Sequence, residues 1–386
     1  ASAGNWPYRY QVDRPAIQAF ATSHIPSPWI GDRGVFELMP SPSEKPQRDR
    51  RKRARRFARA GEHASPHEYR VELDGVSVLL TAARHAVGMR FRSHSDKLSV
   101  VVDHLGEAVS AAWAEHDGAL HLDVHLRDGG GRPDHHVHAV LPGVRRHDLA
   151  LSRGSLRGAI VFERPAVDIV VGMSTIDAAQ AAENARAGGG IDSMRAAAEA
   201  AWRGVFERFE ISAQGAVSDD TLRSIAGSLA RVFSYPNAHD EPSPGGPRYR
   251  SPIDGVVRSG TYSSNNGFWD TYRTAWPLLG LLAPRTAAAL ADGFVQHFRD
   301  AGWVARWSAP GPVDSMTGTT SDTVFAGLEA LGVAIDTRQA YRSALRHATV
   351  PAADPRVGRT GLRPAIFRGF TDTDTHEGMS WTLDNA

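Results

Sequence analysis

The sequence predicts two domains of different class, an antiparallel β-sandwich followed by an all-α domain that is either a helical bundle or a helical toroid. The 386 residues exceed the usual size of one domain, and 41% of them are hydrophobic, which is enough for a sizeable core. Hydrophobicity has a period of two from about residue 67 to 180 and a helical period after about residue 190. We therefore expect a β-sandwich domain at 1–190, a linker helix at 191–215 and a helical domain at 216–386.

Alternating runs separated by turn residues predict the strands of the sandwich. In LHLDVHLRDGGG, Leu120, Leu122 and Val124 point to one side of a strand, whereas His121 and Asp123 point to the other side, and glycines follow. Three further runs have this pattern: EYRVELDGVSVLLTAA, KLSVVVDHL and AVDIVVGMS. So many short strands in succession indicate two antiparallel sheets packed face to face.

Spacings of three and four residues between apolar positions predict the helices of the second domain. The first helix follows the glycines at 188–190, and its apolar face is formed by five residues: Met194, Ala198, Trp202, Val205 and Phe209. Ser218 is the predicted N-cap of a second helix, and Asp336 is that of a later one. Further helices are expected at three stretches: 285–300, 321–331 and 337–347. No strands are expected between these helices.

Charge and cysteine content restrict the classes of function. The formal net charge of +1 gives no reason to expect a nucleic-acid partner. The chain has no cysteine, which excludes disulfides, thiol catalysis and zinc–thiolate sites. It has no run of about 18 apolar residues, so we expect no membrane partner. The opening ASAGNWPY resembles what remains after signal-peptide cleavage, and we expect a secreted, cell-surface or periplasmic protein.

A basic segment, SEKPQRDRRKRARRFARAGEH, is the densest run of charge in the chain. The arginines between Arg50 and Arg59 could bind the phosphates of a nucleic acid, but Phe57 is the only aromatic residue available there for base stacking. A solvated loop explains the run more simply. An anionic glycan, such as one that carries phosphate, is a third alternative.

Histidines on the strand at 119–127 raise the question of a metal site. His121, Asp123 and His125 share one face, and HHVH follows at 135–138. Imidazole and carboxylate groups together could hold a transition metal. Alternation on a solvated sheet face gives the same pattern, and we favour this second interpretation because the chain contains 17 histidines.

The segment NNGFWDTYRTAWPLLGLLAP is the strongest candidate for a binding site. A sugar presents an apolar face of C–H groups and a rim of hydroxyls, which proteins bind with aromatic planes and with carboxylate or guanidinium groups. Trp269, Asp270, Arg273 and Trp276 provide such groups within a short stretch. The alternative is that both tryptophans belong to the core and that Asp270 and Arg273 form an i,i+3 ion pair.

This segment resembles the signature segment of the family 92 glycoside hydrolases, which are calcium-dependent α-mannosidases. The resemblance extends along nearly the whole chain, because five further stretches are similar to the family in the same order: IQAFATSHIPSPWIGDRGVFELMP, HEYRVELDGVSVLLTAARHAVGMRF, VVGMSTIDAAQAAENA with AAWRGVFERFEI, DAGWVARWSAPGPVDSMTGTTSDTVFAGLEALGV and FRGFTDTDTHEGMSWTLDNA.

The resemblance implies a fold and an activity. The family combines an N-terminal antiparallel β-sandwich with an (α/α)6 barrel, so this chain is expected to be a multidomain β plus α protein with a partial barrel. The implied activity is exo-α-mannosidase, with preference for α-1,2 links in mannose-containing glycans. Inversion requires a carboxylic acid and a carboxylate on opposite sides of the bond, with Ca²⁺ as the cofactor that binds sugar hydroxyls.

The resemblance also suggests site residues. Trp269 and Asp270 match the family's mannose-binding Trp-Asp pair, in which Asp270 accepts hydrogen bonds from sugar hydroxyls. Residues in or near the pocket are expected to include four more: Trp29, Arg273, Arg306 and Trp307. His376 and Glu377 lie in a segment that is near the site in relatives, without an assigned role.

The sequence departs from the family in one respect. The family's general acid lies in a GNEP-type motif and its base in a later aspartate pair, and neither motif is found here. We expect the acid, the base and most calcium ligands beyond Ala386, so that this chain provides roughly the first half of an enzyme whose remainder is missing or is a second chain. Two alternatives remain, a mannose-1-phosphate diester hydrolase of the same family and a fragment that binds glycans without catalysis.

Overall fold

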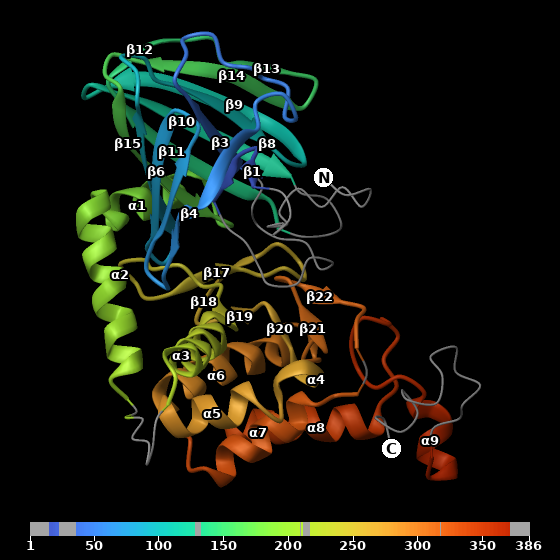
Figure 1. The fold of residues 1–386 in the computed structure, drawn as a ribbon. Helices are drawn as coiled ribbons and strands as arrows, with labels where there is room; N and C mark the ends of the chain where they lie inside the picture. The colour runs from blue at the N-terminus through green and yellow to red at the C-terminus, as the bar shows by residue number, and fades with distance from the viewer. Residues whose placement is uncertain are drawn as a thin grey trace. The chain divides into compact units, whose positions relative to one another are not determined.

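The computed structural model describes residues 15–22, 36–127, 133–208, 210, 217–316 and 318–370. The chain divides into two compact units, of which the first ends at Glu207 and the second begins at Arg208. The first unit contains two large antiparallel sheets, and the second contains most of the helices (Figure 1). The predicted fold class, a β domain followed by a helical domain, is confirmed.

One sheet of the first unit has nine strands among the described residues, and each strand is antiparallel to its neighbours. In spatial order these strands are β1 (Ala16–Ile17), β4 (Arg55–Ala64), β5 (Tyr69–Leu73), β6 (Val76–Ala82), β7 (Ala86–Ser93), β15 (Ala166–Ser174), β11 (His135–Pro142), β10 (Ala119–Arg127) and β9 (Glu107–His116).

The other sheet has six strands in the described part of the chain. In spatial order five of them are β12 (Val144–His147), β14 (Ser155–Phe162), β8 (Ser99–His104), β3 (Phe36–Ser41) and β2 (Phe20–Ala21), and the sixth, β13 (Ala150–Ser152), pairs with β14. Strands β3 and β8 are buried along their whole length, so both of their faces are covered.

The two sheets share one hydrophobic core, which makes the first unit a β-sandwich. The alternation in β10 places Leu120 and Leu122 in this core, whereas His121 and Asp123 are half-buried on the opposite face, as the sequence predicted. Phe36 on β3 contributes to the same core from the six-stranded sheet.

Two helices follow the last strand of the sandwich. The first, α1 (Ala178–Gly188), begins at Asp177, whose side chain accepts a backbone N–H of the first turn at 2.7 Å. Gly172 on β15 allows α1 to pack closely, because a Cβ there would lie 2.2 Å from the carbonyl oxygen of Ala181. The second helix, α2 (Ile191–Phe206), is the one that the change of period predicts.

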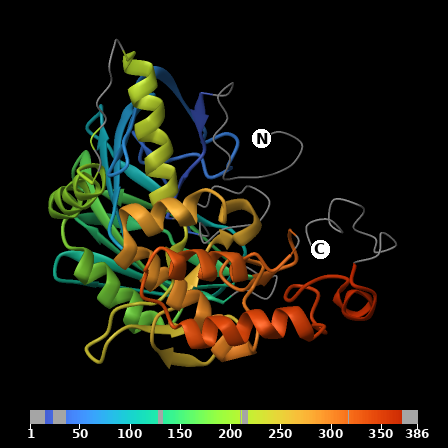
Figure 2. The same ribbon diagram turned by 90° about the horizontal axis from the view of Figure 1, so that it is seen from below.

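The helices of the second unit are α3 (Asp219–Ser234), α4 (Phe268–Thr271), α5 (Ala275–Leu282), α6 (Pro284–Ala301), α7 (Ser321–Ala330), α8 (Thr337–Thr349) and α9 (Leu362–Arg368). Helices α5 to α8 pack against one another around a common core, and they are among the orange and red ribbons of Figure 2. Ser218 and Asp336 cap α3 and α8 through side-chain oxygens, as predicted.

The expectation that no strands lie between these helices is wrong. Seven strands of two or three residues occur in the described part of the second unit: β16 (Asn237–Ala238), β17 (Arg248–Arg250), β18 (Val257–Ser259), β19 (Ser263–Ser264), β20 (Asn266–Gly267), β21 (Trp307–Ser308) and β22 (Pro312–Val313). Strands this short contain too few residues for an alternating pattern, so periodicity could not reveal them. No helix in the described residues is long and apolar enough to cross a membrane.

Candidate functional site

The candidate segment is not one continuous helix. It starts on the short strand β20, forms the single turn α4, breaks at Thr274, where φ is −127° and ψ is −79°, and continues as α5. Pro277 lies in the first turn of α5, where an N–H would have no acceptor within the helix, so its missing N–H costs nothing there. The break directs the two tryptophans of the segment into different surroundings.

Trp276 belongs to the core of the second unit. It is 1% exposed, and its ring lies 5.9 Å from that of Phe268 and 6.0 Å from that of Phe294. The hypothesis that Trp276 provides a sugar-binding plane is therefore wrong, because the side chain is enclosed by aromatic neighbours. For this residue the alternative, a core tryptophan, is correct.

Trp269 and Asp270 are accessible on α4. Trp269 is 38% exposed, and Asp270 is also exposed. The Nε1–H of Trp307 donates a hydrogen bond of 2.9 Å to Oδ2 of Asp270. An exposed indole and a carboxylate bonded to Trp307 therefore belong to consecutive residues at the surface of this unit.

Gly267 makes the contact between Asp270 and Trp307 possible. It pairs with Trp307 across the ladder of β20 and β21. A Cβ on residue 267 would lie 2.0 Å from Nε1 of Trp307 and 2.2 Å from Oδ2 of Asp270, far inside van der Waals contact. The backbone of Gly267 is extended, with φ −103° and ψ 112°, so a glycine is required here for space and not for its torsion angles.

Arg306 fixes the strand that carries Trp307. The residue is 4% exposed, and its side chain donates to Oγ1 of Thr360 and to Oδ1 of Asp314, both at 2.7 Å, and also to the carbonyl oxygen of Pro355. Its own carbonyl oxygen accepts the N–H of Phe268 at 3.2 Å. Arg306 is therefore next to Trp307 in the chain, and its guanidinium group ties loops together.

The other predicted site residues have no described contact with Asp270 or Trp307. Arg273 is exposed, and its guanidinium lies over the ring of Tyr272, 4.5 Å from the centroid. In the described residues, Asp270 is bonded to Trp307 and not to Arg273. Trp29, and the segment with His376 and Glu377, lie outside the described residues.

Two residues of the segment have roles that the sequence analysis did not assign. Asn265 has a positive φ of 59°, a conformation that asparagine tolerates better than most residues, and its Nδ2 donates to Oδ1 of Asn237 at 2.8 Å. Oδ1 of Asn266 accepts the hydroxyl of Thr271 at 3.1 Å, which ties β20 to the end of α4. The sequence Asn-Asn-Gly is a turn signal, but it does not show what the turn holds in place.

This geometry suits the binding of a polyhydroxyl ring. The indole of Trp269 offers an apolar plane for C–H groups. Oδ2 of Asp270 accepts from Trp307, which leaves Oδ1 for hydroxyl donors among the described surroundings. A carboxylate accepts stronger hydrogen bonds from hydroxyls than a neutral amide does, so Asp270 is the polar centre of the site.

Two family descriptions match the chain. The Glycosyl hydrolase family 92 catalytic domain matches residues 177–386, and the Glycosyl hydrolase family 92 N-terminal domain matches residues 2–130. The chain belongs to glycosyl hydrolase family 92. Trp269, Asp270 and Trp307 all lie within the stretch that matches the catalytic domain of this family.

Solved structures of family 92 proteins share the fold. An inverting mannosidase from Bacteroides thetaiotaomicron superimposes with a TM-score of 0.90 at 23% identity, covering 99% of this chain and 55% of that one. A second α-mannosidase from the same organism superimposes with a TM-score of 0.80 at 19% identity, covering 97% of this chain and 55% of that one. The complex of that α-mannosidase with mannoimidazole has a TM-score of 0.80 at 20% identity, covering 97% of this chain and 54% of that one. The chain thus spans about half the length of these structures. A comparison with curated proteins found no match.

Three histidines on β10 and β11 of this family 92 chain bond to one another or to aspartates. Nδ1 of His121 lies 3.3 Å from Nε2 of His138. Nδ1 of His138 in turn lies 2.8 Å from Oδ1 of Asp123. Separately, Nε2 of His125 lies 2.7 Å from Oδ2 of Asp134. Within the described residues, no group of three or more His, Asp or Glu side chains is placed to share a metal ion.

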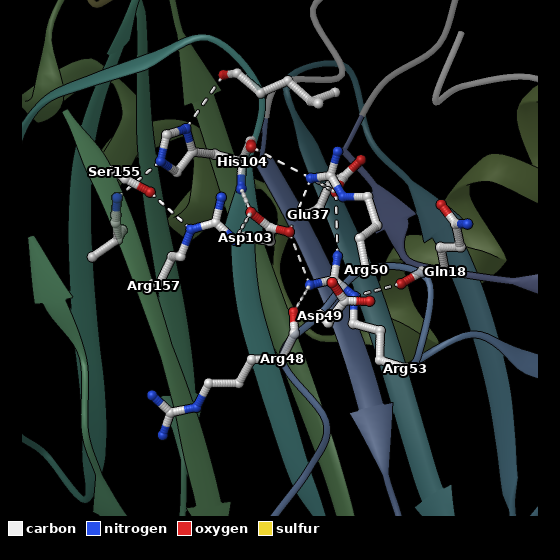
Figure 3. A network of polar contacts seen from close by, with 12 residues as sticks. Gln18, Glu37, Arg48, Asp49, Arg50, Arg53, Asp103, His104, Ser155 and Arg157 are labelled. Atoms are coloured by element: carbon white, nitrogen blue, oxygen red, sulfur yellow. Dashed lines mark hydrogen bonds and ion pairs between the residues drawn. The ribbon is translucent and has the colours of Figure 1, made fainter. Parts of the chain in front are cut away.

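The basic segment of the family 92 chain is only partly a solvated loop. Arg53 is 5% exposed, and its Nη1 lies 2.8 Å from Oδ2 of Asp103, while Arg50 bonds to Glu37 at 2.7 Å and to Asp103 at 2.9 Å (Figure 3). Burial raises the pKa of Glu37. Burial acts in the same direction on Asp103, but Arg50, Arg53, the backbone N–H of His104 and Arg157 together outweigh it and lower the pKa of Asp103. The expectation of full solvation is wrong for Arg50 and Arg53, because buried carboxylates on β3 and β8 hold them.

Proposed function

We propose that this chain provides the mannose-binding part of an exo-acting α-mannosidase that cleaves α-1,2 links with inversion. The observation that carries the proposal is the exposed Trp269 beside the oriented carboxylate of Asp270, within the stretch that matches the family 92 catalytic domain. Two solved structures with this fold are described as mannosidases, and one of them binds mannoimidazole.

In this proposal the terminal mannose stacks on Trp269 and donates hydroxyl hydrogens to Asp270. Trp307 holds Asp270 in one orientation before the sugar arrives, which lowers the entropy lost on binding. Gly267 and Arg306 keep Trp307 in reach of the carboxylate. Hydrolysis with inversion further needs a general acid and a general base, and we assign neither role to a described residue.

Calcium dependence is part of the proposal and rests on the family resemblance. The described residues do not offer three or more carboxylate or imidazole groups around one point, so we assign none of them as calcium ligands. We likewise propose export to the cell surface, the periplasm or the medium.

Release of mannose from α-1,2-mannobiose by the full-length protein tests the function. We expect hydrolysis that stops when calcium is chelated and returns when calcium is added back. The proposal would be refuted if no mannose were released with calcium present, with calcium chelated, or after calcium is added back. Calorimetric binding of mannose to this chain, without hydrolysis by the full-length protein, would instead support a glycan-binding role.

A further inference from the structure

The outer face of β3 and β8 is covered and contains a cavity. Three cross-strand pairs form this face: Glu37 with Asp103, Met39 with Val101, and Ser41 with Ser99. Arg50 and Arg53 of the basic segment cover the first pair (Figure 3). Next to it, over Met39 and Val101, lies a cavity of about 160 Å³.

Positively charged side chains dominate the lining of this cavity. Lys52, Arg53 and Arg55 line it, together with a single carboxylate, Asp74. The charge of Arg53 is already matched, because Arg50 and Arg53 together face the two carboxylates of Glu37 and Asp103. Lys52 and Arg55 carry two positive charges against the one negative charge of Asp74, which leaves one excess positive charge around the cavity.

Arg55 lines the cavity, and two hydrogen bonds fix its guanidinium group. Its Nη1 donates to the carbonyl oxygen of Asp74 at 2.7 Å, and its Nη2 donates to Oγ of Ser41 at 3.0 Å. Among the described residues, no acceptor is bonded to its buried Nε. Burial lowers the pKa of Arg55, although the nearby carboxylate of Asp74 acts in the opposite direction.

The size and remaining walls of the cavity limit what can fill it. Met39, Pro40 and Pro46 provide apolar walls, and Ser41 and Gln47 add neutral polar groups. The volume accommodates several water molecules or one small oxyanion with a short organic group.

We propose that this cavity binds a phosphate group, either as inorganic phosphate or as part of a small phosphate ester. A guanidinium fork and a lysine ammonium are the groups that proteins use to hold phosphate oxygens, and Ser41 adds a hydroxyl. The cavity lies in the first unit and shares no residue with the site around Asp270, so the inference is independent of the proposed mannosidase function.

The test is a calorimetric titration of the chain at constant ionic strength. Inorganic phosphate, glucose 6-phosphate and acetate are titrated into the wild type, into Lys52→Gln and into the matched control Lys45→Gln. Lys45 and Lys52 are both exposed lysines of the same segment, but only Lys52 lines the cavity, so both variants lose one charge and neither disturbs the core.

We expect saturable binding of phosphate that is five- to tenfold weaker in Lys52→Gln and unchanged in Lys45→Gln. Tighter binding of glucose 6-phosphate than of phosphate identifies an ester as the ligand, whereas the reverse order identifies free phosphate. The proposal is overturned if neither phosphate compound binds saturably, if both lysine variants weaken binding equally, or if acetate binds as tightly as phosphate.

Discussion

Replacement of Gly267 by alanine tests whether the packing at Asp270 and Trp307 is as close as the structure shows. The new methyl carbon would lie 2.0 Å from Nε1 of Trp307 and 2.2 Å from Oδ2 of Asp270, so at least one of these groups must move by more than 1 Å. The extended backbone of Gly267 suits alanine, so backbone strain contributes little. The variant therefore isolates the effect of volume at one point.

Two terms set the size of the effect. Overpacking of a tight site costs about 1–3 kcal/mol. Loss of the indole hydrogen bond to a carboxylate costs up to about 1.5 kcal/mol, since Asp270 is exposed and water replaces the donor in part. The total is about 1–4.5 kcal/mol, which lowers the melting temperature of a unit of this size by about 2–18 °C.

Thermal unfolding followed by circular dichroism measures this loss, and calorimetry with mannose measures the effect on binding. Gly327→Ala is the matched control, because Gly327 lies within α7 with no atom near its missing Cβ. That variant is expected to stabilise α7 by about 0.5–1 kcal/mol. If Gly267→Ala leaves both the melting temperature and the mannose affinity at wild-type values, the close packing inferred for this site is incorrect.

Two further predictions concern buried charged and titratable groups. Arg53→Met leaves Glu37 and Asp103 with Arg50 as their main partner and is expected to lower the free energy of unfolding by about 3–5 kcal/mol, measured by urea denaturation. The control Arg51→Met, at an exposed position, is expected to change this free energy by less than about 0.5 kcal/mol. Equal effects of the two substitutions would contradict a buried ion-pair network. Burial lowers the pKa of His297 from 6.5 to about 4, so the unfolded chain binds a proton more readily and stability falls as the pH drops from 6.5 towards 4. This loss in the free energy of unfolding reaches about 3 kcal/mol and is expected to be absent in His297→Gln. Identical plots of unfolding free energy against pH for the wild type and His297→Gln would refute the prediction.

The sequence predicts the elements whose pattern is long enough to show a period. The alternation from Leu120 to Leu126 defines a strand, and Ser218 and Asp336 mark helix starts, because each signal depends on neighbouring residues alone. Helix α1 escapes this reasoning since its residues are mainly alanine and polar, and the short strands β16 to β22 contain too few residues for a pattern. These elements are fixed by tertiary contacts that local sequence does not contain.

The candidate site shows the same limit at the level of single residues. Trp269 and Trp276 are seven residues apart and would share one face of a continuous helix, yet the break at Thr274 exposes the first and buries the second. The bond from Trp307 to Asp270 joins residues 37 apart in sequence. Spacing along the chain cannot reveal such a contact, although a glycine ahead of a Trp-Asp pair hints at a close approach.

The buried ion pairs of the basic segment could not be predicted from the sequence for a different reason. A run of arginines is usually solvated, and Glu37 and Asp103 each stand alone within apolar strands. Only the pairing of β3 with β8 brings the two carboxylates opposite each other, where they require cations.

The central claim is that Trp269 and Asp270 hold the terminal mannose. Its most direct test is kcat/KM of the full-length protein on α-1,2-mannobiose, measured for the wild type, Trp269→Ala, Asp270→Asn and the exposed control Arg285→Gln on α6. Loss of the stacking plane or of the carboxylate is expected to lower kcat/KM by about 10- to 100-fold, which corresponds to about 1.4–2.8 kcal/mol, with a small effect at Arg285. Wild-type kcat/KM in both Trp269→Ala and Asp270→Asn would show that the sugar binds elsewhere.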